Sequence, residues 1–161
     1  MAAVMIFALF AVVFSAVALE PRYSFDDVKV NGVSVQSVER VGILVAEANH
    51  IRVERDSDVV IEVFYHARGG DVRRDDTRVQ VELDGYEYDL IEDHSEIFSV
   101  DPGQMGRKVL SIHIPEDIDA SDFYKLRVSI SDDDGELVQN YLLKVEEPRH
   151  SVNIYDVILQ P

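Results

Sequence analysis

The sequence of 161 residues contains no cysteine and no tryptophan. The absence of cysteine excludes disulfide bonds, cysteine nucleophiles and thiolate metal sites. Because many eukaryotic secreted domains rely on disulfides, it also favours a prokaryotic source for an exported protein of this kind. A fold without such crosslinks depends on its packed core, and hydrophobic residues, at 47% of the chain, are numerous enough to form one.

Basic residues are also scarce. The 15 Lys and Arg face 31 Asp and Glu, which gives a formal net charge of −16. Such a domain lacks the basic face that binds nucleic-acid phosphates, and an anionic membrane surface would repel it. The charge leaves three interpretations open, namely solubility, calcium binding and adaptation to high salt.

The N-terminus is a long apolar segment. Residues 1–18 contain no charged side chain, and Ala16 and Ala18 place small residues at the two positions that a signal peptidase reads. No Lys or Arg precedes the apolar run, which departs from the usual signal peptide. We expect residues 1–18 to be a signal peptide, with a retained membrane anchor and a pilin-like helix as alternatives. Residues 19–161 would then form one extracellular domain at the cell surface, in contact with a membrane only through residues 1–18 if these are not cleaved.

The rest of the chain has the pattern of a strand-rich domain. Apolar and polar residues alternate through residues 123–130, which is typical of a strand with one buried and one solvated side. Similar alternation predicts strands at residues 58–67, 78–84 and 108–114, and a further strand is predicted at 50–55. The Asn31-Gly32 pair between two apolar stretches predicts a β-hairpin. About nine strands at intervals of roughly ten residues indicate an all-β fold, an antiparallel sandwich or barrel.

Other segments carry weaker signals. The sequence predicts a weak strand over residues 42–46, an exposed loop over 67–77, and at most one helical turn over 116–122. A last strand is predicted over His150–Leu159, apolar on both faces. No amphipathic helix is predicted after the N-terminus.

Tyr124 lies at the start of a predicted strand, directly after an acidic turn, in the sequence DFYKLRV. This setting resembles the tyrosine corner of Ig-like and fibronectin-type domains, in which the phenol hydrogen-bonds back to nearby backbone. With GYEYDL and EEPRHSVNIYDVIL, residues 25–160 resemble archaeal exported Ig-like or CARDB-like surface proteins of S-layer type. The resemblance implies an antiparallel Ig-like or fibronectin-type β-sandwich of about eight to nine strands, preceded by an apolar N-terminal helix. It supplies no catalytic residues to transfer.

Two acidic loops are candidates for metal binding. Asp117 and Asp119 have the spacing of the first ligands of an EF-hand loop, but the later positions lack the glycine and the bidentate acid that such a loop requires. Asp132, Asp133 and Asp134 form a denser cluster at a predicted hairpin tip. Calcium takes roughly six to eight oxygen ligands, so this cluster would have to recruit a neighbouring loop such as 117–122. These five aspartates are the calcium candidates, and no other cofactor is expected.

No catalytic signature is present. The chain has no G-x-S-x-G nucleophile turn and no glycine-rich phosphate loop, and its five histidines lack the close spacing of a zinc site. The sequence therefore predicts a protein that is not an enzyme. A sugar-binding platform is not favoured either, because there is no tryptophan and most tyrosines fall on strand positions that are expected to be buried.

These observations predict a non-catalytic extracellular module with a structural or adhesion role in a surface layer or filament. Its partners would be other surface-protein domains or copies of itself, contacted through the segment His150–Leu159 by strand addition. Two alternatives stay open. One is a calcium-stabilised surface domain that uses the acidic loops, and the other is an exported module that binds carbohydrate or another ligand.

Overall fold

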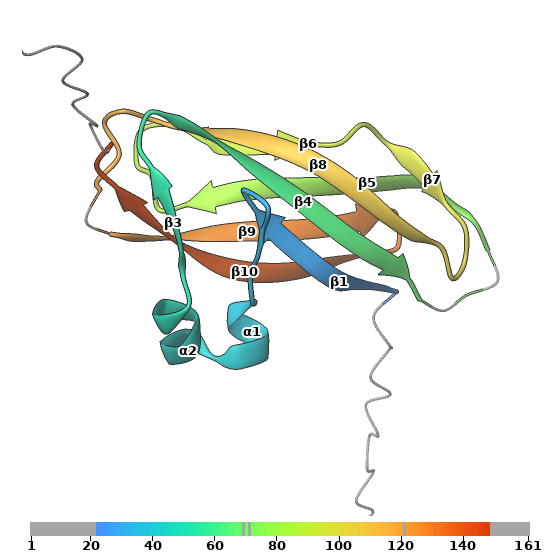
Figure 1. The fold of residues 1–161 in the computed structure, drawn as a ribbon. Coiled ribbons are helices and arrows are strands. Elements are labelled where there is room, and N and C mark those ends of the chain that lie inside the picture. Colours follow the sequence, from blue (N-terminus) through green and yellow to red (C-terminus); the bar gives the residue numbers. More distant parts are fainter. Residues whose placement is uncertain (1–21, 69, 71, 121, 149–161) are drawn as a thin grey trace, which may run out of the picture.

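The strands of the computed structural model form two sheets that pack face to face (Figure 1). One sheet has the order β2-β1-β4-β8, and the other has the order β3-β10-β9-β5-β6, with β7 paired to the start of β5. The structure describes residues 22–68, 70, 72–120 and 122–148. The strands are β1 (Tyr23–Val30), β2 (Val33–Ser34), β3 (Ile51–Glu54), β4 (Ser57–Ala67), β5 (Arg74–Asp84), β6 (Ile91–His94), β7 (Phe98–Val100), β8 (Met105–Ile114), β9 (Phe123–Asp132) and β10 (Gly135–Glu146).

Every second residue of the long strands points into the space between the sheets, which confirms the all-β sandwich and the predicted buried faces. Fully burying one valine, leucine or isoleucine side chain contributes about 1.5–3 kcal/mol to the free energy of folding. Three strands supply most of the residues that the sequence predicts to face the core, and all of these residues are buried: Val59, Ile61, Val63 and Tyr65 of β4, Leu110, Ile112 and Ile114 of β8, and Tyr124, Leu126, Val128 and Ile130 of β9.

The predicted hairpin is present between β1 and β2. Asn31 and Gly32 both have positive φ, at 50° and 80°, as a two-residue type I′ turn requires. Val30 pairs with Val33 across this turn, and Asn31 also binds β4, because its side-chain oxygen accepts from the Val60 N–H at 3.0 Å.

The weak strand predicted over residues 42–46 is wrong, because this segment is helical. The short helices α1 (Val38–Val41) and α2 (Ile43–Ala48) meet at Gly42, whose φ is 79°. Helices this short are not stable alone, so contacts with the sandwich must hold them. Asn140 of β10 donates from its backbone N–H and its side-chain nitrogen to the Glu39 carboxylate, at 3.0 and 2.5 Å. Burial opposes ionisation of Glu39, but these bonds outweigh it and lower its pKa.

Three further expectations need correction. The loop predicted over residues 67–77 ends early, because β5 begins at Arg74 and Thr77 is fully buried. The sheets are not purely antiparallel, since β3 pairs with β10 in parallel. The described residues form ten strands, more than the expected eight to nine.

Other predictions fall on residues that the structure does not describe. The apolar helix and signal peptide over residues 1–18 lie outside the described residues, as does the strand predicted over 150–159. Among the residues that are described, no helix is long and apolar enough to cross a membrane.

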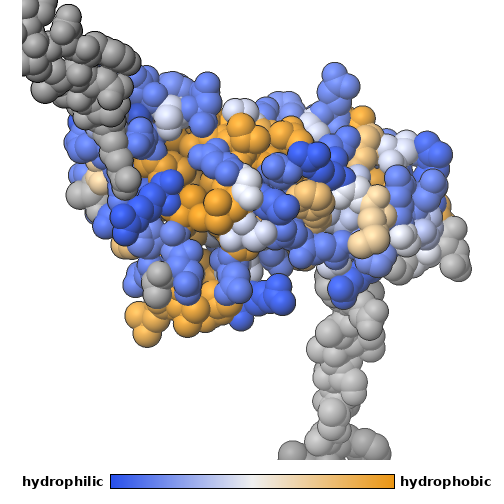
Figure 2. All heavy atoms as spheres, viewed as in Figure 1, coloured by the Kyte–Doolittle hydropathy of each residue, from blue (hydrophilic) through white to orange (hydrophobic). Residues whose placement is uncertain are grey.

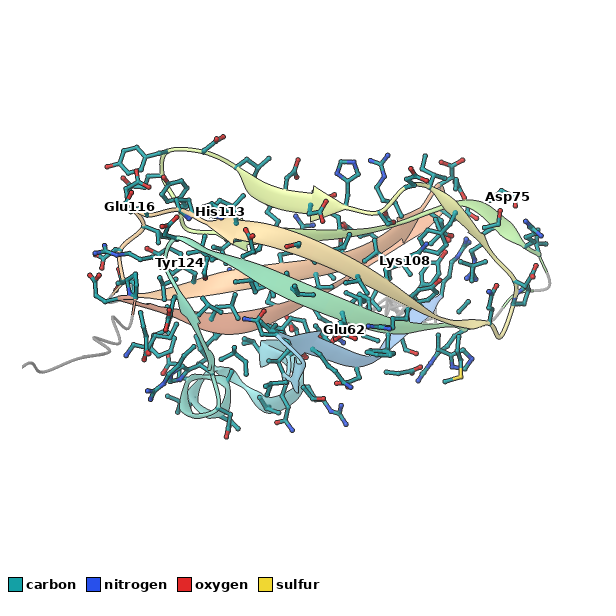
Figure 3. All side chains as sticks on the ribbon, turned by 45° about the horizontal axis from the view of Figure 1, so that its top comes forward. Glu62, Asp75, Lys108, His113, Glu116 and Tyr124 are labelled. Atoms are coloured by element: carbon teal, nitrogen blue, oxygen red, sulfur yellow. The ribbon has the colours of Figure 1, made fainter. Side chains whose placement is uncertain are left out.

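The connections between strands gather at two opposite ends of the sandwich. The tyrosine end comprises the turns at residues 55–56 and 85–90 and the loop at 115–122. The arginine end comprises residues 22–23, 72–76, 101–104 and 132–134. Glu116 and Tyr124 lie at the first end and Asp75 at the second, with β9 running between them (Figure 3).

Candidate functional site

The loop between β8 and β9 is held at the tyrosine end by one apolar side chain. Pro115 follows β8, and Ile118 is buried in the core with only 1% of its surface exposed. The two aspartates on either side of it, Asp117 and Asp119, are exposed. Burial of Ile118 therefore fixes the loop and presents both carboxylates at the surface.

The turn between β5 and β6 brings two tyrosines to the same place. Gly85 begins this turn with φ of 106°, a conformation that side chains other than glycine rarely adopt. The Tyr86 hydroxyl donates to Asp117 Oδ1 at 2.6 Å. The Tyr86 and Tyr88 rings meet edge to face, with centroids 5.5 Å apart and an angle of 67°. Tyr88 is 78% exposed, so its ring is presented to solvent.

A cavity of about 310 Å³, which we call the tyrosine hollow, lies between these two segments. Its lining combines aromatic rings with carboxylates: Tyr86, Tyr88, Tyr124, Glu87, Asp117, Asp119 and Asp122, together with Gly85 and Ile118. A second hollow of about 430 Å³ adjoins it and shares Asp117, Ile118 and Asp119. Arg55, which also lines the second hollow, is paired there with Glu147.

Two tyrosines of the tyrosine hollow have raised pKa values, so they hold their protons more tightly than usual. The hydrogen bond to the Asp117 carboxylate raises the pKa of Tyr86 to about 12. Burial raises the pKa of Tyr124, although a hydrogen bond from the backbone of Asp119 acts against this. The latter bond ties the phenol to backbone a few residues upstream.

The carboxylates of the tyrosine end have few cationic neighbours. Within the described part of the chain, Glu87, Glu116, Asp117 and Asp122 form no ion pair. No Lys, Arg or His lines the tyrosine hollow. The lining of the hollow therefore carries an excess of negative charge, which favours cations over anions.

The arginine end contains a similar tyrosine–aspartate pair that is buried and complete. The Tyr23 hydroxyl donates to Asp132 Oδ2 at 2.7 Å and lies 3.1 Å from the Thr77 hydroxyl. Arg74 Nε lies 3.4 Å from Asp132 Oδ2, and its guanidinium stands over the Tyr23 ring, 4.8 Å from the centroid. Only 2% of the Asp132 side chain and 11% of the Arg74 side chain are exposed. Burial raises the pKa of Tyr23.

The other two aspartates of this cluster also have partners inside the protein. Asp134 is ion-paired with Arg22, and its N–H donates to Asp132 Oδ1 at 2.9 Å. The N–H of Asp133 donates to Asp76 Oδ2 at 2.8 Å. A side-chain hydrogen bond between the same two residues raises the pKa of Asp133.

The structure does not bring the five calcium candidates together. Asp117 and Asp119 lie before β9 and Asp132 ends it, and ten residues of strand span about 33 Å. The two loops therefore do not combine in one site, and Asp132 already binds Arg74 and Tyr23. Among the described residues, no group of three or more His, Asp or Glu side chains is placed to hold a metal ion. Calcium binding at either loop alone stays a prediction.

The sequence reasoning missed Tyr86 and Tyr88, because it placed most tyrosines on buried strand positions. The Asp84-Gly85 pair carries the signal that corrects this. It ends β5, so the residues after it do not follow the alternation of a strand. Exposure of Tyr88 therefore removes one objection to a ligand-binding surface.

No family model and no curated protein sequence matches this chain. Solved structures do match it. The C-terminal domain of Wzt has a TM-score of 0.51 at 12% identity, over 87% of this chain and 84% of that chain. A Niemann-Pick type C2 protein from Japanese carpenter ant has a TM-score of 0.49 at 8% identity, over 78% of this chain and 94% of that chain. The likeness to the Wzt domain supports the β-sandwich fold alone, and the weaker one adds nothing to it.

Proposed function

We propose that this chain is a non-catalytic recognition or adhesion module of an exported cell-surface protein, and that its binding site is the tyrosine hollow. The observation that carries the proposal is the exposed Tyr88 ring, held edge to face against Tyr86, whose hydroxyl is fixed by Asp117. Aromatic surface beside a few positioned polar groups is typical of ligand sites. Loops presented by a rigid scaffold are also where binding residues concentrate.

The chemistry of the hollow supports binding without catalysis. A general acid or base works best when its pKa lies near the operating pH. The shifts resolved in this hollow are upward shifts at tyrosines, and the pKa of Tyr86 is about 12. Both groups therefore stay neutral at physiological pH and act as hydrogen-bonding groups. Export rests on residues 1–18, and the partner would be another molecule of the cell surface.

A solution titration followed by NMR tests this proposal. A labelled chain is mixed in turn with neutral oligosaccharides, basic peptides and calcium. We expect one class to shift the backbone amides of Tyr86, Tyr88 and Ile118, and Tyr88→Ala to weaken that binding at least about tenfold by removing the ring. Val33→Ala truncates another exposed apolar side chain, in strand β2, and serves as the matched control.

Two results would overturn the proposal. One is that no class of ligand shifts the amides around the hollow. The other is that Tyr88→Ala binds as well as the parent chain, which would place the site elsewhere.

A second candidate function, assembly with copies of the same chain, is favoured by the surface of α2. Ile43, Leu44 and Val45 are consecutive and exposed, and apolar spheres gather over the helical segment in Figure 2. Exposed apolar clusters of this kind mark protein contacts. Light scattering separates the two functions, since assembly predicts oligomers that Leu44→Glu disrupts while Tyr88→Ala leaves them intact.

A further inference from the structure

The two ends of the sandwich contain the same pair of groups, a tyrosine hydroxyl that donates to an aspartate. At the arginine end Tyr23 donates to Asp132 at 2.7 Å, and at the tyrosine end Tyr86 donates to Asp117 at 2.6 Å. The first pair is completed by the guanidinium of Arg74, which lies over the ring and beside the carboxylate. The second pair has no such cation among the residues that line the tyrosine hollow.

We infer that the tyrosine hollow binds an organic cation, namely the guanidinium or ammonium of a basic peptide segment in a partner protein. This inference rests on the proposed function and names the chemistry of its ligand. The bound cation would take the place at Tyr86 and Asp117 that Arg74 takes at Tyr23 and Asp132.

The charge of the hollow supports a cationic ligand over a neutral one. Glu87, Asp117 and Asp122 line it and form no ion pair among the described residues. A neutral ligand that covered the hollow would remove several carboxylates from water without supplying a counter-charge, which is costly. A guanidinium or ammonium offsets this cost with charge-assisted hydrogen bonds.

The aromatic rings are a second observation, independent of the carboxylates. The Tyr88 ring is mostly exposed and stands at 67° to the Tyr86 ring. Cations bind over such rings within about 6 Å of the centroid. The protein already uses this contact at its surface, because Lys108 Nζ lies 3.7 Å from the centroid of the Phe98 ring.

Size and ligand arrangement favour an organic cation over a metal ion. Calcium requires roughly six to eight oxygens around one point. In the part of the chain that the structure describes, no three acidic or histidine side chains converge in that way. The volume of about 310 Å³ lies at the lower limit of ligand pockets, near 300 Å³, which suits one side chain and its neighbours.

The test uses a peptide of sequence Gly-Arg-Gly-Arg-Gly and its citrulline analogue, which has the same shape without the charge. We expect the arginine peptide to shift the amides of Tyr86, Tyr88 and Ile118 and the analogue to bind at least about tenfold more weakly. Added salt should weaken the arginine peptide's binding. Asp117→Asn, which keeps an oxygen for the Tyr86 hydroxyl, should weaken binding by a similar factor. Asp75→Asn at the arginine end is the matched control and should have no effect.

The outcomes distinguish a failure of this inference from a failure of the proposed function. If a neutral oligosaccharide or calcium shifts the hollow and the arginine peptide does not, the cationic ligand is wrong and the binding site stands. Equal binding of the citrulline analogue, or peptide-induced shifts confined to residues 132–134, also overturns the inference. If none of these probes shifts the hollow in a folded chain, both the inference and the proposed function fail.

Discussion

The two ends of this sandwich use the same side chains for different purposes. At the arginine end the tyrosine–aspartate pair is buried and completed by Arg74 from β5. At the tyrosine end the corresponding pair, Tyr86 and Asp117, lies in a hollow at the surface and borders an exposed ring. A buried pair with its cation fixes the positions of β1, β5 and β9 relative to one another. The exposed pair has no such cation among the residues that line the hollow, and it belongs to the binding site that we propose.

The difference follows from where each residue lies along its strand. Tyr23, Arg74 and Asp132 belong to the ends of three strands, so the sheets themselves bring these side chains together. Tyr86 and Asp117 belong to loops, where Gly85, the buried Ile118 and their mutual hydrogen bond position them. Charges buried within strands affect stability strongly, whereas charges on loops are available for function at little cost to the fold.

The largest expected effect is the loss of the buried carboxylate. Asp132→Ala removes the buried carboxylate from the Arg74 guanidinium and the Tyr23 hydroxyl, although Arg74 keeps the Arg22 and Arg68 carbonyls and Tyr23 keeps Thr77. Removing one partner of a buried ion pair typically costs about 3–5 kcal/mol. We expect a loss of this size in the free energy of unfolding, measured by denaturation with urea.

Asp122→Ala is the control for this experiment at the tyrosine end. Asp122 is exposed and has no ion pair among the described residues, so its removal should change the free energy of unfolding by less than about 0.5 kcal/mol. Equal effects of the two substitutions would show that the arginine end is not the more tightly coupled one.

Neutralising acids is expected to change the melting temperature in opposite directions at the two ends, or to leave it unchanged at the arginine end. The triple variant Glu87→Gln, Glu116→Gln and Asp122→Asn removes exposed charges that form no ion pair among the described residues, in a chain of net charge −16. Because these charges repel one another and the rest of the domain, their loss should raise the melting temperature by a few degrees, roughly 1 kcal/mol or less. The increase should shrink in high salt, which screens the same repulsion.

Neutralising ion-paired acids at the arginine end provides the comparison. Asp75 pairs with Arg73, and Asp134 pairs with Arg22. The double variant Asp75→Asn and Asp134→Asn should leave the melting temperature unchanged or lower it slightly, since exposed ion pairs contribute little. A rise equal to that of the triple variant would mean that net charge alone, and not its placement, decides the effect.

Much of the fold could be predicted because its main strands carry their own pattern. The alternation that includes Leu126 and Ile130 was enough to identify β9 and its buried side, and Asn31-Gly32 identified a hairpin. The helical segment could not be predicted in this way. Val38–Ala48 is too short to be helical by itself, and the contact of Glu39 with Asn140, far along the chain, stabilises it.

The candidate site was predicted only in part, for a similar reason. Asp117 and Asp119 do lie in the hollow, but β9 separates them from Asp132, so the acidic cluster at 132–134 does not recruit this loop, and calcium binding at either loop stays a prediction. Thr77 is buried, and the Tyr23 hydroxyl reaches it across the sandwich at 3.1 Å. Side-chain partners that distant in sequence leave no periodic signal, so spacing along the chain cannot reveal them.

The smallest expected effect concerns Asp133, which is the exception at the arginine end because its nearest side-chain partner is another acid. The hydrogen bond with Asp76 raises the pKa of Asp133 above its ordinary value of 3.8. A carboxyl with a raised pKa binds its proton more tightly in the folded chain, so folding is favoured as the pH falls through that pKa and penalised above it.

Asp133→Asn removes the penalty and should raise the melting temperature at pH 7 by about one or two degrees. The advantage over the parent chain should shrink as the pH falls through the raised pKa and vanish below the ordinary value of 3.8. An advantage that stays constant from pH 7 to below pH 3.8 would show that the acid pair is not its cause.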